Sequence, residues 1–211
     1  MILKIVLTIN YLKENKFTNM AINILTTVQE NLHYPPLHKI DPNTQEVIND
    51  GSTDQSNDFS QAALPAVLTG LYKYSSTDNG AQEILRGDFS TNWVAKIFEE
   101  NKTDIIDKIA DYVHSSKLSS NEHLNEIATE AVKVIRENIP PESTPKDVKI
   151  FFSNQLKNIL PYLPAALHVG DLLNDTTLDD NTNKMEGPIS SLMHAIGSAF
   201  STPESKKDSH P

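Results

Sequence analysis

Histidine and carboxylate side chains are the groups that could bind a transition metal here, because the 211 residues include no cysteine. His33 and His38 flank the sequence Tyr-Pro-Pro-Leu, where a shared metal ion is geometrically conceivable. His114 and His123 fall on successive predicted helices. His114 stands at a predicted helix end, where an imidazolium interacts favourably with the last carbonyls. The spacing His-Glu-x-x-His is absent from the sequence. We therefore expect solvated or helix-capping histidines and assign no metal ligands.

Two polar segments, residues 50–58 and 179–183, alternate oxygen-bearing side chains in the manner of a calcium-binding loop. Such a loop needs glycine at its sixth position for a sharp turn and a bidentate acid at its twelfth. Gln55 and Lys184 occupy the sixth positions, and neither segment has an acid at the twelfth. Both segments are better explained as helix caps and turns.

The motifs of nucleophilic and phosphate chemistry are also missing from the sequence. It contains no G-x-S-x-G elbow, no G-x-G-x-x-G and no Walker phosphate loop. The acid pairs Glu99-Glu100 and Asp179-Asp180 are adjacent, so on a helix they diverge by about 100°. We assign no catalytic or cofactor-binding residue and expect no cofactor. The sequence favours a non-enzymatic protein, although Asp, Glu, His and Tyr residues that are distant in sequence could still assemble a site.

Charge argues against a nucleic-acid partner. The chain carries 18 Lys and Arg against 28 Asp and Glu, for a net charge of −10. Binding to phosphates needs clustered positive charge, and the strongest basic groups, Lys146/Lys149 and Lys206-Lys207, are sparse. No stretch reaches the roughly 18–20 apolar residues of a membrane span. The absence of cysteine fits a reducing cytoplasm, so we expect a cytoplasmic protein with no membrane partner.

The first nineteen residues differ from the rest of the chain. They are mostly Ile, Leu, Lys, Asn, Phe and Tyr, the mixture that translated A/T-rich non-coding DNA gives. A clean amphipathic pattern begins at Met20. Our hypothesis is that Met20 is the native initiator and residues 1–19 are a non-native extension. The alternative is an ordinary first strand or helix, and a natural peptide that contains Ile5 to Leu12 would establish it.

Apolar residues recur every three to four positions along most of the chain, which predicts helices. We find no alternating pattern typical of strands after residue 19, so the predicted fold is all-α, a multi-helix orthogonal bundle of about seven to nine short helices. The predicted parts are an N-terminal helical segment 20–48, a flexible linker 49–58 without apolar residues, a helical core domain 59–173, an acidic loop 174–186, a C-terminal helix 187–200 and a disordered tail 201–211.

The core domain opens with the most apolar helix. Residues 59–74 are apolar around most of the circumference, which predicts burial on several sides, and Gly70 would permit close helix approach. Pro65 falls in a first turn or makes a kink. Short helices follow at 80–86, closed by Gly87, and at 91–98.

Capping residues mark three longer helices. We expect them to begin at Thr103, at Ser119 or Ser120, and at Thr144, the last with a proline and an acid in its first turn. Prolines then break residues 160–173 into a kinked or two-part helix. The motif L-P-A-x-L occurs at 64–68 and 163–167, which permits an internal duplication or a coincidence of helix-start residues.

A resemblance to a known family lies in the first half of the core. The segment ALPAVLTGLYKYSSTDNGAQEIL, residues 63–85, is similar to the signature of the bacterial YidB-like domain of unknown function. The later segment LPYLPAAL resembles that family's hydrophobic helix, whereas a total of 7 glycines is low for it. The resemblance implies a small cytoplasmic helical protein with no established activity, and it supplies no catalytic residues.

Two function classes follow from the sequence. The first is a non-enzymatic self-association or protein-interaction module that uses residues 59–74 or the helix 189–200, with a protein partner or a second copy of the chain. The alternative is a small-ligand binder or an enzyme with a non-local Asp/Glu/His site. Trp93, the single tryptophan, could anchor a partner, but we expect it in the core.

Overall fold

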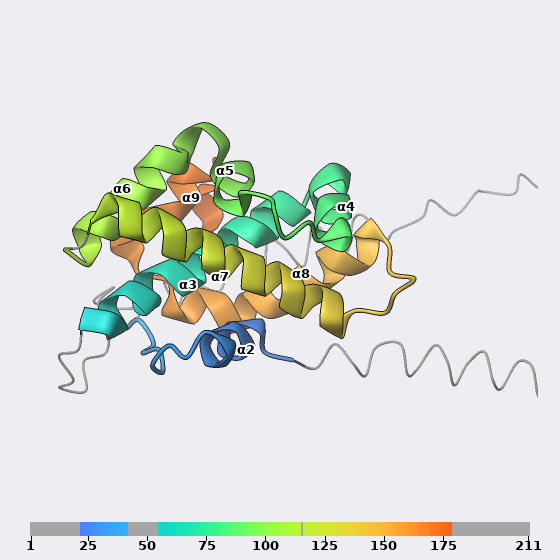
Figure 1. Cartoon of the computed structure of the whole chain (residues 1–211), viewed down its shortest axis with the longest axis horizontal. Helices are drawn as coiled ribbons and strands as arrows, with labels where there is room; N and C mark the ends of the chain where they lie inside the picture. The colour runs from blue at the N-terminus through green and yellow to red at the C-terminus, as the bar shows by residue number, and fades with distance from the viewer. Residues whose placement is uncertain (1–21, 42–54, 115, 179–211) are drawn as a thin grey trace, which may run out of the picture.

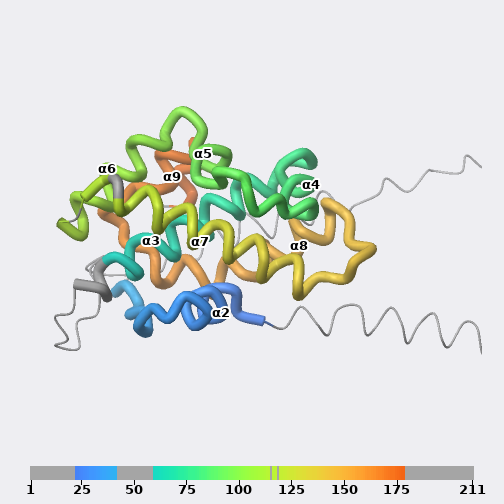
Figure 2. Tube along the Cα trace, viewed as in Figure 1, coloured from blue at the N-terminus to red at the C-terminus, as the bar shows by residue number. Residues whose placement is uncertain are grey.

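The described part of the protein is an all-α bundle, as the sequence predicts. A computed structural model describes residues 22–41, 55–114 and 116–178, and these contain helices and no β-strand. The α-helices are α2 (Ile24–Asn31), α3 (Gln55–Ser75), α4 (Asp78–Arg86), α5 (Trp93–Phe98), α6 (Lys102–Tyr112), α7 (Lys117–Asn138), α8 (Pro145–Ile159) and α9 (Val169–Leu172). Figures 1 and 2 show α2 along one edge of the bundle and α5 and α9 along the opposite edge.

Several predictions fall on residues outside the described part. They are the proposed extension 1–19 with its start at Met20, the segment 42–54 that includes most of the linker, the C-terminal helix 187–200 and the tail 201–211. The calcium-like segment 179–183 lies there too.

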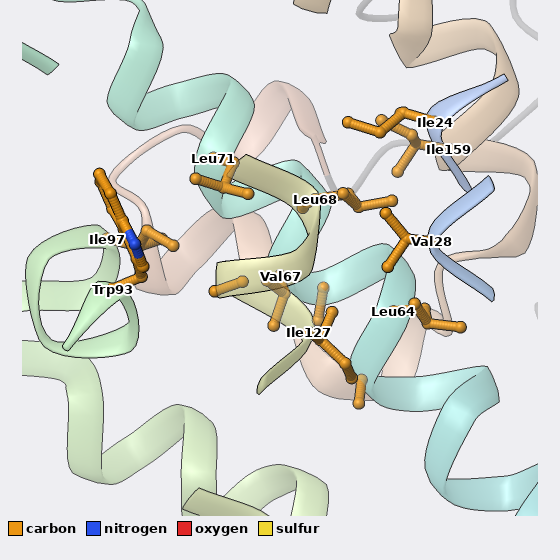
Figure 3. Close-up of a cluster of buried hydrophobic side chains, with 14 of the residues drawn as sticks. Ile24, Val28, Leu64, Val67, Leu68, Leu71, Trp93, Ile97, Ile127 and Ile159 are labelled. Atoms are coloured by element: carbon orange, nitrogen blue, oxygen red, sulfur yellow. The ribbon is translucent and has the colours of Figure 1, made fainter. Parts of the chain in front are cut away.

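Helix α3 forms the centre of the bundle. It contacts α2, α4, α5, α6, α7 and α8, and Figure 3 shows its Leu64, Leu68 and Leu71 pointing to different neighbours. The apolar residues of its middle turns have no exposed surface: Ala62, Ala63, Leu64, Ala66, Val67, Leu68 and Leu71. A helix that is apolar on all sides is stable in water only when other elements cover all of them. This burial confirms the predicted environment of residues 59–74.

The start of α3 corrects the predicted boundary of the linker. The helix begins at Gln55, so residues 55–58 are helical. Once the buried segment forms a helix, each residue added at its N-terminal end gains a hydrogen bond at small entropic cost, so polar residues extend it. Pro65 accordingly lies in the helix interior and not in a first turn.

Helix α5 packs closely against α3 at Gly70. A Cβ atom at this position would lie 2.4 Å from Ile97 Cγ2 and 3.0 Å from the Phe98 ring. Trp93, on the same short helix, is 1 % exposed, so the prediction that it belongs to the core is confirmed (Figure 3). The missing side chain of Gly70 therefore sets the distance between these two helices.

The helix ends confirm some predicted caps and correct others. Thr144 and Asp147 form a capping box at the start of α8, as expected, and Gly87 ends α4 in the left-handed conformation with φ 57°. Ser116 caps α7, three residues before the predicted Ser119. Thr103 lies inside α6, because the 3₁₀ turn η1 (Glu99–Asn101) runs directly into that helix and removes the need for a side-chain cap.

The segment after α8 consists of short turns rather than a kinked or two-part helix. It comprises the 3₁₀ turns η2 (Leu160–Tyr162), η3 (Ala165–Leu167) and η4 (Thr176–Leu178), with α9 between the last two. Prolines 161 and 164 lack the amide donors that a continuous helix needs. The predicted acidic loop 174–186 thus begins with an ordered turn, and its Leu178 is 1 % exposed.

The two L-P-A-x-L motifs have different structures. Residues 64–68 lie in the interior of α3, whereas 163–167 form an extended residue followed by the turn η3. Shared sequence at these positions therefore does not correspond to a shared structural unit, and the structure gives the duplication hypothesis no support.

We predict that Gly70→Ala lowers the free energy of unfolding by about 1–3 kcal/mol, the usual cost of overpacking a core. The clash with Ile97 Cγ2 outweighs the gain in helix propensity from alanine. Urea denaturation of the purified variant measures the change. Ile97→Leu removes the clashing methyl group, so a double-mutant cycle should show recovery of part of the loss. Equal stability of Gly70→Ala and the parent chain would contradict this account of the α3–α5 contact.

Candidate functional site

The histidines of the described part are dispersed. His33 and His114 follow helix ends in the left-handed conformation, with φ 58° and 52°. His38 is held through its backbone by Gln61, and His123 stacks edge-on against Phe59 with ring centroids 5.4 Å apart. Within the described residues, no three His, Asp or Glu side chains converge as metal ligands would.

A cleft of about 560 Å³ lies between the C-terminal end of α3, α4, α5, η1 and the turn after α9. Its floor and walls combine the apolar side chains of Ile97, Phe98, Leu172 and Leu173 with polar residues from all of these elements. The buried contacts of α3 with α4 and with α5 fix the walls, since each of these two helices packs against α3 in the core. This cleft is the candidate site.

Glu83 is the centre of a polar network in the cleft. The Tyr74 hydroxyl donates a hydrogen bond of 2.5 Å to its Oε2, and the Lys96 ammonium lies 2.6 Å from the same oxygen. Asn79 donates a longer bond of 3.4 Å to Oε1. The hydrogen bonds from Lys96 and then Tyr74 lower the pKa of Glu83. The carboxylate is therefore ionised at neutral pH and holds together three elements.

Tyr74 remains protonated in this network. Burial raises the pKa of its phenol, and the hydrogen bond to Glu83 and the negative charges of Glu83 and Glu99 raise it further. A phenol that donates to an ionised carboxylate acts as a fixed donor. Neither Tyr74 nor Glu83 changes its protonation state near pH 7, so the pair is poorly suited to general acid–base catalysis.

A second ion pair fixes the opposite wall. Lys73 at the end of α3 lies 2.9 Å from Asp175 Oδ2, and the Thr177 hydroxyl donates a bond of 2.6 Å to Asp175 Oδ1. Burial raises the pKa of Asp175, but the bonds from Thr177 and Lys73 outweigh this effect and lower it overall. Asn101 donates to the Leu172 carbonyl at 2.8 Å. These bonds attach the turn after α9 to the body of the bundle.

Glu99 and Glu100 stand at the rim of the cleft. Both side chains are exposed, as predicted for a solvated acid pair, and within the described residues neither carboxylate has a hydrogen bond or an ion pair. Glu99 has φ 46° and ψ −117°, a backbone conformation that favours glycine and costs a residue with a side chain about 1–3 kcal/mol. Glu99 is both the C-cap of α5 and the first residue of η1, so this conformation lies where the chain passes directly from one to the other.

Patterns along the sequence indicate little of this cleft. Tyr74, Glu83 and Lys96 belong to three helices, and no spacing rule links residues that meet only through tertiary packing. The sequence shows the acid pair Glu99-Glu100. It does not show that the pair lines the same cleft as Lys73 and Lys96. The one available signal was the density of polar residues in 73–83, between two apolar helices.

Comparison with known proteins adds no relative. No protein family, curated protein or solved structure matches this chain. Separately, no helix in the described ranges is both long enough and apolar enough to span a lipid bilayer.

We predict that Glu83→Gln lowers the free energy of unfolding at pH 7 by about 1 kcal/mol, because charge-assisted bonds to Tyr74 and a partly exposed Lys96 are lost. The pKa of Glu83 is lower in the folded chain than its usual value of 4.5. Its stabilisation is therefore complete above pH 4.5 and disappears as the pH falls through the folded-state pKa.

Denaturation at a series of pH values checks this prediction. The difference between the parent chain and Glu83→Gln isolates Glu83, because the other carboxylates are present in both proteins. Tyr74→Phe provides the matched control: it removes one hydrogen bond and keeps the carboxylate. A difference that grew on acidification would contradict the assigned direction.

Proposed function

We propose that this chain is a non-enzymatic binding protein whose cleft between α3, α4, α5 and α9 takes a small cationic ligand. The observation that carries the proposal is the charge arrangement of the cleft. Its two lysines, Lys73 and Lys96, are each paired with a carboxylate, while Glu99 and Glu100 at the rim have no partner in the described part of the chain. A cation approaching the rim therefore meets an uncompensated negative potential.

The walls favour a ligand with both a charged group and an apolar part. Ile97, Phe98 and Leu173 offer apolar surface beside the carboxylates. Pockets of this composition bind through buried apolar area and orient the ligand by a few polar groups. An organic amine matches this combination better than a bare metal ion, which would need several converging oxygen ligands.

The fixed protonation states of Tyr74 and Glu83 support a binding function over a catalytic one. An effective general acid or base has a pKa near the working pH, whereas the pKa of Tyr74 is raised and that of Glu83 is lowered. Both groups are also engaged with each other and with Lys96. Tyr74 and Glu83 therefore line the cleft, the first as a neutral group and the second as a negative charge.

Titration with putrescine, a small diamine, tests the proposal. We expect amide chemical-shift changes in an isotope-labelled chain to be confined to residues 96–101 and 172–174, and to weaken as salt screens the carboxylates. Glu99→Gln combined with Glu100→Gln should reduce the affinity by about three- to tenfold, from two weak charge interactions.

A matched control changes the net charge equally outside the cleft. Glu122 and Glu137 are exposed on α7, so Glu122→Gln with Glu137→Gln should leave the affinity for putrescine unchanged. Equal losses in the two double variants would show attraction to the overall negative charge alone and would overturn the cleft as a site.

Self-association is the second proposed function. Of the two surfaces expected for it, the helix 189–200 lies outside the described residues, and residues 60–71 are buried in the core of the described fold, so this part of α3 is not an external contact surface. Phe89, 51 % exposed, is the one large apolar side chain on the surface of the described part. What favours self-association is the N-terminal segment, residues 22–41, which packs on the bundle from outside.

The cellular setting is part of the proposal. The lack of cysteine supports a reducing compartment, and we propose a cytoplasmic location on that ground. The likeness of residues 63–85 to the bacterial YidB-like domain supports a bacterial origin and membership of that family.

A further inference from the structure

The segment 22–41, which we call the N-terminal strap, is held on the bundle by two buried glutamines. Gln155 of α8 accepts a hydrogen bond of 3.0 Å from the Ile24 amide and donates one of 2.8 Å to the Ile22 carbonyl. The Gln155 side chain is almost fully buried, with the residue 3 % exposed. Both the oxygen and the nitrogen of its side-chain amide therefore bond to backbone atoms of the strap.

Gln61 of α3 holds the other end of the strap in the same way. Its Oε1 accepts from the His38 amide at 2.8 Å, and its Nε2 donates to the His38 carbonyl at 2.9 Å. The same Nε2 also donates to the Tyr162 carbonyl at 2.8 Å. Two residues later the Ile40 amide donates to the Pro161 carbonyl at 2.8 Å. The rest of the bundle thus binds the strap's backbone at two places.

Apolar side chains fill the space between these two clamps. Ile24, Leu25, Val28 and Ile40 of the strap are at most 6 % exposed. Figure 3 shows Ile24 and Val28 close to Ile159 of α8 and Leu68 of α3. The strap therefore occupies a groove formed by α3, α7 and α8.

An empty groove would be costly. Without the strap, its apolar partners in α3, α7 and α8 would be exposed to water, which is the main cost. Gln61 and Gln155 would exchange their hydrogen bonds to the strap for hydrogen bonds to water, at a smaller net cost of about 1 kcal/mol each. The groove consequently needs an occupant with this strap's backbone path and apolar spacing. Every copy of the chain carries one.

We propose that the strap can seat in the groove of a second copy, so that two chains associate by reciprocal exchange of residues 22–41. The contacts allow exchange because they join the strap to residues that lie beyond the 42–54 connection, from Gln61, 23 positions after His38, to Gln155, 131 positions after Ile24. Thirteen residues, 42–54, connect the strap to α3, and a chain of that length reaches up to about 45 Å. Exchange needs no new kind of contact, since each groove is still filled by residues 22–41 of an identical chain. The inference rests on the proposed self-association and supplies its surface.

Single cysteines in this cysteine-free chain test the exchange. Asn31 on the strap lies beside Glu130 of α7, with Nδ2 and Oε1 2.7 Å apart. Asn31→Cys and Glu130→Cys chains are mixed in urea, refolded together and treated with a short bismaleimide. A link between positions 31 and 130 in this mixture must join two chains. The double variant Asn31→Cys/Glu130→Cys confirms that the reagent spans the pair, and circular dichroism confirms that each variant is folded.

Glu100→Cys gives the matched control. Glu100 is exposed in η1, which directly follows α5, and α5 lies on the side of the bundle away from α2 (Figure 1). We expect the 31–130 mixture to yield about tenfold or more linked dimer than a 31–100 mixture, because a seated strap holds its thiol at a far higher effective concentration than random encounter does. Equal yields from the two mixtures would overturn the exchange.

Light scattering of the parent chain separates the two proposals. A concentration-dependent dimer together with the 31–130 link supports both. A dimer without that link overturns strap exchange and leaves self-association through another surface. A monomer at every concentration, with linked yields at the control level, overturns both.

Discussion

The complete burial of α3 is the constraint on which the rest of the structure depends. A helix that is apolar around its circumference must be covered on every side, and in the described fold α2 and α4 to α9 all contact it. Small residues make the covering close: with no side chain at Gly70, α5 approaches until Ile97 and Phe98 fill the space that a Cβ atom would need. The positions of α5 and of η1, which continues from it, follow from this contact.

The cleft is a consequence of the same packing. The last turn of α3, which ends at Ser75, lines the cleft together with residues of α4, α5, η1 and the turn after α9. Glu83 joins α4 to α3 through Tyr74 and to α5 through Lys96. The Lys73–Asp175 pair attaches the turn after α9. The ionic bonds thus stabilise the rim of a space that apolar packing created, and they leave Glu99 and Glu100 unpaired there within the described fold.

The strap shows a different way of covering the core. Its apolar residues contribute burial, but its position is specified by two glutamine side chains that bond to backbone atoms. Backbone recognition is indifferent to side-chain identity, and it can be made equally well by an identical segment from another chain. A core element attached in this way, and joined to the rest by a long connection, is physically suited to exchange between copies.

Local chemistry was enough to predict much of the fold. The period of apolar residues determined the helical class and the burial of most of residues 59–74 and of Trp93. Capping residues marked the helix ends at Thr144 and Gly87. These features depend on neighbours within one or two turns. Tertiary packing decided the rest. As a result, α3 begins at Gln55, and η1 leads directly into α6 without a side-chain cap. Residues 160–173 form short turns. Tertiary packing also brought Tyr74, Glu83 and Lys96 together from three helices, and Gln61 and Gln155 onto the strap. Contacts between residues of different helices depend on how the helices cross in space. The spacing of residues along the sequence does not determine these crossings.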